Sequence, residues 1–191
     1  MILVTAFKPF GTLKENSSFE ALSKANLQDN VKKYYLDVDL VKTKEELEYL
    51  IDNVKPEMII MFGESGMFPK VQIERRAHNL LNFRIEDNGG HMPINQKIEE
   101  KGKEYLTSSL NIDYLIAYLK AAGIEAEASL DAGQFICNYS YYLALKTKIP
   151  CVFVHLPLFI GQSSDPKYYY RDYLYIVRAV ELTVKGLTIK K

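Results

Sequence analysis

The chain has 191 residues, of which 48% are hydrophobic and 25% charged, so we expect residues 1–191 to fold as a single domain with its own core. Basic and acidic residues both number 24, and a formal net charge of zero disfavours nucleic acid as the main partner. No run of 18 apolar residues is present and only two cysteines occur, so we expect no membrane span, no disulfide framework and a cytoplasmic protein.

Strand and helix signals alternate through the first half of the chain. The apolar start lacks a cationic segment and meets Pro9 at once, which favours a strand over a signal peptide. The predicted elements are a strand over 2–6, a helix over 17–27, a strand over 34–41, a helix from a capping box at Thr43 to a stop at Pro56, and a buried strand over 58–62.

The second half continues the alternation after a less regular stretch. Residues 71–83 favour strand but are interrupted by charge, and a turn at 87–90 leads into a polar, loop-like segment over 91–108. The elements predicted next are a helix over 111–122, a strand over 125–130, a turn over 131–133, a helix over 135–146, a strand over 150–155 and a helix over 166–187.

This alternation predicts parallel βαβ units, hence a three-layer α/β/α domain. We expect a twisted, mostly parallel sheet that can include antiparallel pairs. Functional groups in such folds gather at the carboxyl ends of the strands. The loops that should carry the chemistry therefore follow Ala6, Phe62, Leu130 and Val154.

A cysteine and a histidine fall at this edge. Cys137 follows Gly133 near the start of a predicted helix, where the helix N-terminus favours the thiolate form. His155 ends a hydrophobic strand one connection later, so the two side chains should meet as an activated nucleophile. The alternatives are a small core cysteine and a buried structural histidine. Cys151, inside the same strand, is expected to be core.

Five short segments, which together span nearly the whole chain, carry a more specific signal. They are 6–11 (AFKPFG), 73–79 (IERRAHN), 84–88 (RIEDN), 132–139 (AGQFICNY) and 153–157 (FVHLP). In this order and spacing they resemble the signature segments of the pyroglutamyl peptidase I (pyrrolidone-carboxylate peptidase) family of cysteine peptidases. Ala6 departs from the family's glycine.

The resemblance implies a fold of the phosphorylase/hydrolase-like class and a catalytic triad of Cys137, His155 and Glu74. It also implies that Arg84 lies near the cysteine, where it could help to stabilise negative charge. From the residues alone, Glu74 would be a surface carboxylate paired with Arg75 or Arg76, and Arg84 would form a solvated ion pair. Within a triad, Glu74 would instead accept a hydrogen bond from His155 and fix its tautomer.

The substrate-binding residues implied by the same resemblance lie near the first and third strands. Phe7 and Phe10 would enclose the flat, neutral pyrrolidone ring, although both could simply fill the core. Asn16 matches a family asparagine but could equally cap a helix, because Ser17 replaces the family's proline. Glu64 replaces a residue that is often uncharged and, in the pocket, would repel substrate carbonyls or raise the pKa of the histidine.

The implied reaction is removal of an N-terminal pyroglutamyl residue from peptides through an acyl-enzyme. The segment 41–45 is shorter and more charged than the family segment that helps to shape the substrate site. Together with Glu64, it leaves an alternative: a catalytically weak member that acts as a binding or regulatory protein, or that cleaves another N-terminal acyl group. No G-x-G-x-x-G, P-loop or H-E-x-x-H motif occurs, so we expect no cofactor and no metal. The family also suggests a homo-oligomer, dimer or tetramer, for which the tyrosine-rich segment 168–175 could supply an interface.

Overall fold

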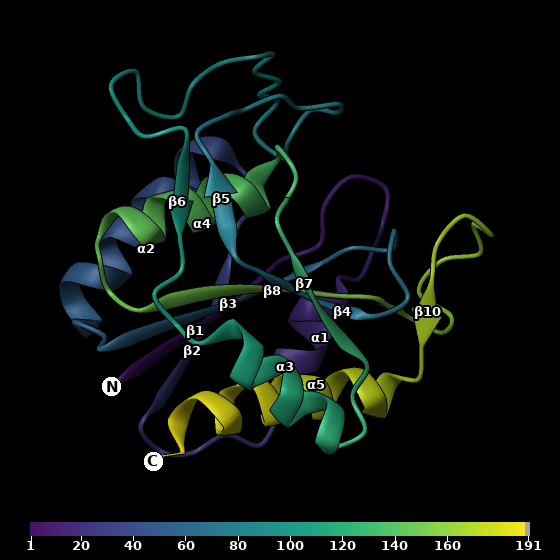
Figure 1. Ribbon diagram of the computed structural model, residues 1–191. Helices are drawn as coiled ribbons and strands as arrows, with labels where there is room; N and C mark the ends of the chain where they lie inside the picture. Colours follow the sequence, from purple (N-terminus) through teal and green to yellow (C-terminus); the bar gives the residue numbers. More distant parts are fainter. Residues whose placement is uncertain (190–191) are drawn as a thin grey trace.

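The computed structural model describes residues 1–189, and a six-stranded sheet lies at its centre (Figure 1). The strands, in spatial order, are β2 (Val31–Leu36), β1 (Ile2–Phe7), β3 (Met58–Glu64), β8 (Cys151–Leu156), β4 (Val71–Glu74) and β7 (Ala126–Ser129). The first four run parallel; β4 is antiparallel to β8, and β7 runs parallel to β4. The predicted mostly parallel sheet is confirmed, with one reversal of direction.

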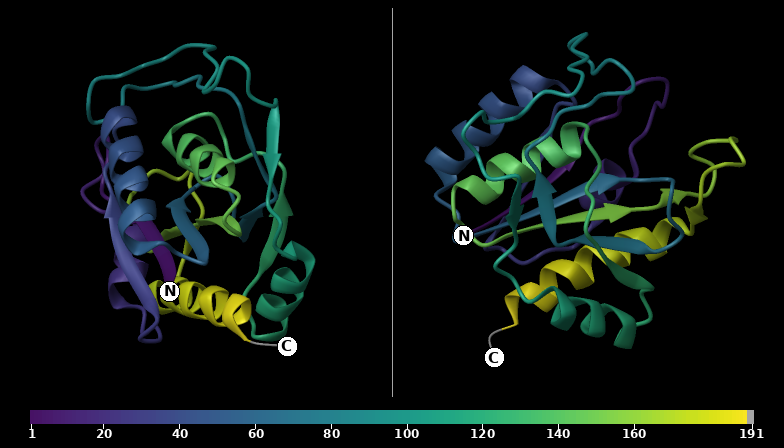
Figure 2. Two further views of the ribbon diagram at one scale, coloured as in Figure 1. Left: turned by 90° about the vertical axis from the view of Figure 1, so that its left-hand side faces the viewer. Right: turned by 45° about the horizontal axis from the view of Figure 1, so that its top comes forward.

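Within residues 1–189, five helices cover the two faces of this sheet. They are α1 (Ser17–Lys24), α2 (Leu40–Val54), α3 (Ile112–Ala121), α4 (Ile136–Lys146) and α5 (Tyr173–Thr188). Helices α2 and α4 pack on one face, and α1, α3 and α5 pack on the other (Figure 2). The first strand shows why both faces are apolar: Val4 points into one core and Leu3 into the other, since successive side chains alternate across a strand. The three-layer α/β/α architecture is thereby confirmed.

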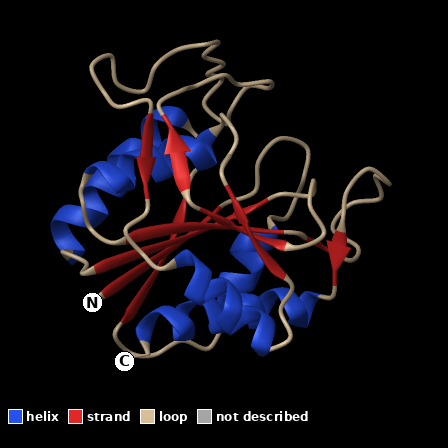
Figure 3. Cartoon of the chain, viewed as in Figure 1, coloured by secondary structure: helices blue, strands red, loops and turns tan. Residues whose placement is uncertain are grey.

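Among the described residues 1–189, two small two-stranded sheets accompany the main sheet. Strand β5 (Arg76–His78) pairs antiparallel with β6 (Tyr105–Thr107), so the segment 91–108, expected to be loop-like, ends in a short strand. Strand β9 (Leu158–Phe159) pairs parallel with β10 (Tyr170–Arg171). Long loops separate the members of each pair (Figure 3). Within residues 1–189, no helix combines the length and the apolar character needed to cross a membrane.

The predicted strand over 34–41 has the wrong bounds, and the capping box predicted at Thr43 is wrong. Strand β2 follows β1 in register and ends at Leu36, and α2 already begins at Leu40. Asp39 caps this helix, because its Oδ1 accepts from the backbone N–H groups of Val41 at 2.9 Å and Lys42 at 3.0 Å. Thr43 lies buried in the first turn, and its hydroxyl donates to a backbone carbonyl instead of capping.

The helix predicted from Pro166 begins later, at Tyr173. Asp172 provides the cap, since its Oδ1 accepts from the N–H of Leu174 at 2.9 Å. Of the tyrosines between 168 and 175, Tyr169 is the exposed one, at 49%. The Tyr170 hydroxyl donates to a carbonyl at 2.7 Å, and the Tyr175 hydroxyl accepts from a backbone N–H, so these rings mainly anchor the segment to the fold.

Candidate active site

Cys137 is the second residue of α4, at the edge of the sheet where β1, β3 and β8 end. Gly133 has φ +78, a left-handed conformation that turns the chain into the helix, and its N–H donates to Asp131 Oδ1 at 2.9 Å. The residue at the N-cap position, Phe135, makes no side-chain capping bond. The first N–H groups of α4 are therefore not satisfied by a capping side chain and favour negative charge near the Cys137 thiol.

His155 and Glu74 come from neighbouring antiparallel strands. In the register of β4 and β8, His155 faces Gln72 and Glu74 faces Phe153, so the His155 and Glu74 side chains are diagonal neighbours on one face of the sheet. His155 Nδ1 lies 2.8 Å from Glu74 Oε1. Glu74 is 1% exposed and His155 9% exposed, so the pair is largely shielded from water.

This environment changes the pKa of His155. Burial alone would lower the pKa, but hydrogen bonds with the Cys137 and Glu74 side chains and the negative charge of both partners outweigh it. Together they raise the pKa of His155 to about 10. The ring therefore favours the imidazolium form at neutral pH, in contact with the thiol on one side and the carboxylate on the other.

The surroundings of Glu74 fix its position. The Tyr141 hydroxyl donates to the Glu74 backbone carbonyl at 3.0 Å, and Glu74 Oε2 is buried without a hydrogen-bond partner among the described residues. The next two arginines point elsewhere: Arg75 pairs with Asp113, and Arg76 Nε donates to a backbone carbonyl at 2.9 Å. The interpretation of Glu74 as a surface carboxylate paired with its neighbour is therefore wrong.

A cavity of about 390 Å³ opens at this point. Its lining includes all eight residues singled out from the sequence: Phe7, Phe10, Asn16, Glu64, Glu74, Arg84, Cys137 and His155. The other lining residues are Val38, Ser65, Met67, Phe68, Asp131, Ala132, Gly133, Phe135 and Ile136. Segments spread over most of the chain thus converge on one concave site.

Three comparisons with known proteins bear on this site. A family model described as pyroglutamyl peptidase matches residues 1–187. A pyrrolidone-carboxylate peptidase of Bacillus cereus is 33% identical over 85% of this chain and 80% of its own, and one of Thermococcus onnurineus is 30% identical over 96% of each. The crystal structure of pyrrolidone carboxyl peptidase from Thermus thermophilus superposes with a TM-score of 0.91 at 32% identity, covering 98% of this chain and 100% of its own.

The chain belongs to the pyroglutamyl peptidase family. It is accordingly a cysteine peptidase, and its fold agrees with that of the solved family members. The structure of pyroglutamyl peptidase I from Bacillus amyloliquefaciens superposes with a TM-score of 0.93 at 26% identity, covering 99% of this chain and 95% of its own. The resemblance noted in the sequence is therefore confirmed at the level of family and fold.

The aromatic residues of the peptidase cavity form a connected wall. Phe7 is the last residue of β1, is 2% exposed and packs on Phe153 with ring centroids 6.3 Å apart. Phe10 is half-buried in the following loop and contacts Phe135 at 5.8 Å, and Phe135 contacts Phe83 at 4.5 Å. Phe7 is thus both a core residue and a cavity wall, while Phe10 is held by a second aromatic cluster.

Asn16 and Glu64 line the cavity but are already engaged by the protein. Asn16 caps α1, because its Oδ1 accepts from the N–H of Ser18 at 3.0 Å and from that of Phe19. Glu64 Oε2 accepts from the N–H of Ser17 at 2.8 Å and from Gln162 Nε2 at 2.6 Å. Burial raises the pKa of Glu64, although these hydrogen bonds oppose the shift.

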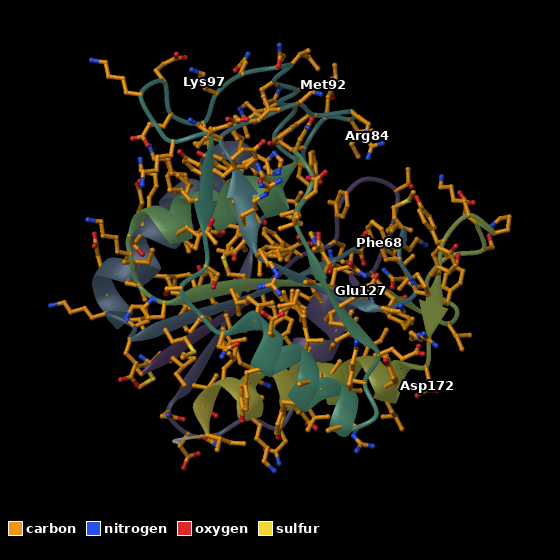
Figure 4. All side chains as sticks on the ribbon, in the orientation of Figure 1. Phe68, Arg84, Met92, Lys97, Glu127 and Asp172 are labelled. Carbon is orange, nitrogen blue, oxygen red and sulfur yellow. The ribbon has the colours of Figure 1, made fainter. Side chains whose placement is uncertain are left out.

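Arg84 and the segment 41–45 differ from the interior residues. Arg84 is exposed on the loop between β5 and β6 (Figure 4) and lines the cavity, and within residues 1–189 its guanidinium forms no ion pair. The segment 41–45, expected to shape the substrate site, lies in the first turns of α2 and does not line the cavity. Val38, just before that helix, takes its place.

Asn138 is a supporting residue that sequence reasoning missed. It is fully buried next to Cys137, and its Nδ2 donates to the carbonyls of His78 at 2.9 Å and Leu80 at 3.0 Å. Its Oδ1 accepts from the N–H of His78 at 2.8 Å. The amide therefore locks β5 against the start of α4. In the sequence, the feature that could have pointed to Asn138 was its position within the segment 132–139, directly after Cys137.

One group of described side chains has the composition of a cation site. Asp39, Asp87 and His91 bring their ligand atoms within 4.8 Å of one another, outside the cavity lining. Backbone N–H groups already occupy these carboxylates: Asp87 Oδ2 accepts from Leu40 at 2.6 Å, and Asp87 Oδ1 accepts from His91 at 2.8 Å. These bonds tie the loop over 87–91 to the start of α2, a structural role.

Gly63 is closely packed against the Cys137 thiol. A Cβ at this position would lie 3.0 Å from Cys137 Sγ and 2.8 Å from Phe153 Cζ, and both contacts are too short. We expect Gly63→Ala to displace the thiol and lower kcat by about tenfold or more, since small misplacements at a reacting atom are costly. Steady-state kinetics together with the melting temperature would check this. A folded variant with unchanged kcat would contradict it, and Gly186→Ala, where a Cβ would lie 2.6 Å from the Tyr118 ring outside the cavity lining, controls for a steric clash as such.

Proposed function

We propose that this protein removes the N-terminal pyroglutamyl residue of peptides by covalent catalysis at Cys137. The observation that carries the proposal is the convergence of Cys137 with the hydrogen-bonded His155–Glu74 pair in one cavity with aromatic walls. Membership of the pyroglutamyl peptidase family supports the same reaction. A binding or regulatory role without turnover has no comparable support.

The chemistry follows from the charges of the three groups. The Cys137 thiolate attacks the carbonyl carbon of the amide bond that joins the pyroglutamyl residue to the next residue. The His155 imidazolium gives its proton to the departing amine as this bond breaks. A thioester remains on the sulfur. Neutral His155 then takes a proton from water, whose oxygen attacks the thioester, and pyroglutamate leaves as the thiolate re-forms. Glu74 holds the Nδ1 proton and keeps Nε2 directed at the sulfur.

The rest of the cavity suits the substrate and the transition state. The pyrrolidone ring is flat and uncharged, so its faces fit against Phe7 and Phe10. Negative charge that develops on the carbonyl oxygen would be stabilised by the N-terminus of α4, with Arg84 at the mouth adding positive charge. Asn16 and Glu64 would border the ring, and their existing hydrogen bonds keep them in place.

Assembly and compartment form part of the same proposal. We propose a homo-oligomer, dimer or tetramer, on the exposed apolar side chains Ile160 (70%), Tyr169 (49%) and Leu174 (72%), which lie close together in sequence. Light scattering on a sizing column would measure the oligomeric state.

Two free cysteines, Cys137 and Cys151, fit a reducing compartment such as the cytoplasm.

Hydrolysis of a pyroglutamyl-coumarin amide under reducing conditions tests the function. We expect release of the fluorophore from this compound and none from the alanyl-coumarin amide, whose charged amine and open chain do not match the cavity. Thiol alkylation should abolish release, whereas chelators should leave it unchanged. Absence of release from folded protein, or equal rates with both compounds, would refute the proposal.

A further inference from the structure

Two large apolar side chains are exposed side by side in sequence at the mouth of the cavity. Met67 is 58% exposed and Phe68 is 47% exposed, and both belong to the cavity lining. In Figure 4, Phe68 lies on the same side of the molecule as Arg84. Adjacent exposed apolar side chains that continue a binding cavity are typical of an interaction site.

Sheet topology places these two residues next to the catalytic histidine. The loop over 65–70 joins β3 to β4, and β8 lies between those two strands. The loop must therefore cross the carboxyl end of β8, where His155 is the penultimate residue. The N–H of Ser65 donates to the carbonyl of Leu156 at 2.8 Å, which ties the loop directly to that end.

The loop is also held from its outer side. The Gly66 carbonyl accepts from the N–H of Tyr169 at 2.8 Å, and the Pro69 carbonyl accepts from Arg171 Nε at 2.8 Å. A Cβ at Gly66 would lie only 2.6 Å from the Tyr168 ring, so the backbone packs tightly on this segment. A loop fixed in this way presents its side chains at little ordering cost when a ligand binds.

We propose that Met67 and Phe68 form the subsite for the side chain of the residue that follows the pyroglutamyl group, and that they select an apolar side chain there. The inference rests on the proposed function, in which His155 protonates the departing amine. The departing residue must then lie on the His155 side of the cavity, beneath this loop, while the aromatic walls Phe7 and Phe10 hold the ring.

The charges around the loop support an apolar preference. Lys70 is the sole charged residue of the loop, and it pairs with Glu127 at 2.9 Å instead of facing the cavity lining. A charged second residue would lose water next to Met67 and Phe68 and find no partner in the loop. An apolar second residue would instead bury the exposed area of both side chains.

Comparison of pyroglutamyl-leucinamide, pyroglutamyl-alaninamide and pyroglutamyl-aspartamide tests the inference, with kcat/KM measured from pyroglutamate release. We expect the leucyl compound to exceed the alanyl compound by about tenfold and the aspartyl compound by more. The double variant Met67→Ser/Phe68→Ser should lower kcat/KM for the leucyl compound to near that for the alanyl compound, mainly through KM. Tyr49→Ser, at an exposed tyrosine on α2 outside the cavity lining, is the matched control.

The outcomes separate this inference from the function on which it rests. Equal kcat/KM values for the leucyl and alanyl compounds, or a preference that survives in the double variant, would overturn the subsite while leaving the peptidase activity established. Failure to release pyroglutamate from all three compounds would instead overturn the proposed function and the subsite with it. Circular dichroism and the melting temperature establish, independently of the rates, that the double variant is folded.

Discussion

Replacement of Cys137 with alanine is expected to lower kcat/KM for a pyroglutamyl-coumarin amide by roughly 10⁴-fold or more. The cavity contains no second nucleophilic thiol, because Cys151 is fully buried in β8. Without the sulfur, no acyl-enzyme forms, and the His155–Glu74 pair has no thiolate to stabilise. Initial rates at several enzyme concentrations, with circular dichroism to verify folding, would measure the loss.

Cys151 provides the matched control. Burial raises the pKa of its thiol, which therefore stays protonated and unreactive. Cys151→Ala should retain kcat/KM within a few-fold and lose some stability to the cavity it creates. Loss of activity in Cys151→Ala with retention in Cys137→Ala would reverse the assignment of the nucleophile.

Replacement of Glu74 with glutamine should lower kcat by about 10²- to 10⁴-fold and shift the pH profile. The amide keeps the shape of the side chain and an oxygen that can accept from His155 Nδ1, but it removes the negative charge that stabilises the protonated ring. Because Glu74 contributes to the raised pKa of His155, about 10 in the native protein, its loss should lower that pKa. We expect the alkaline limb of kcat/KM to move to lower pH by about one unit or more.

Glu48→Gln controls for the change of charge. Glu48 lies on α2, pairs with Lys44 one helical turn away and is absent from the cavity lining. Its variant should keep the wild-type rate and profile. If Glu74→Gln lowered the rate without any shift of the alkaline limb, Glu74 would act only as a packing residue.

The same pair makes stability depend on pH. The folded pKa of His155 lies above the ordinary value of 6.5, so its stabilising contribution is complete below pH 6.5 and is lost as the pH rises toward 10. Urea unfolding at pH 6 and pH 9 should show this loss in the wild type and a smaller one in Glu74→Gln.

Cys137 and His155 were within reach of sequence reasoning because their positions follow from the βαβ pattern: one starts a helix and the other ends a buried strand. Glu74 was not, since a carboxylate followed by two arginines has the pattern of a solvated surface. Only the family resemblance singled it out. Its burial arises from a contact 81 residues away across antiparallel strands, which local pattern does not encode.

The errors in the elements have a related cause. Asp39 and Thr43 could each cap the start of α2, and Thr43 has the more conspicuous sequence pattern. Because β2 pairs with β1 and ends at Leu36, the helix begins early and Asp39 is the cap. Met67 and Phe68 belong to a loop whose position above β8 follows from strand order, not from sequence order. Residues that act through the arrangement of the sheet therefore became visible only in the structure.

The strand order also has a consequence for biosynthesis. Among the strands of the main sheet, β3 and β4 follow one another along the chain. In space, however, β8 lies between them, and β8 is the last strand of that sheet to be translated. Until residues 151–156 leave the ribosome, β3 and β4 each present an edge without its final neighbour, and such edges pair readily with other chains. A nascent or truncated chain that ends before β8 would thus expose two apolar edges, and chaperones that shield such edges would be needed late in synthesis.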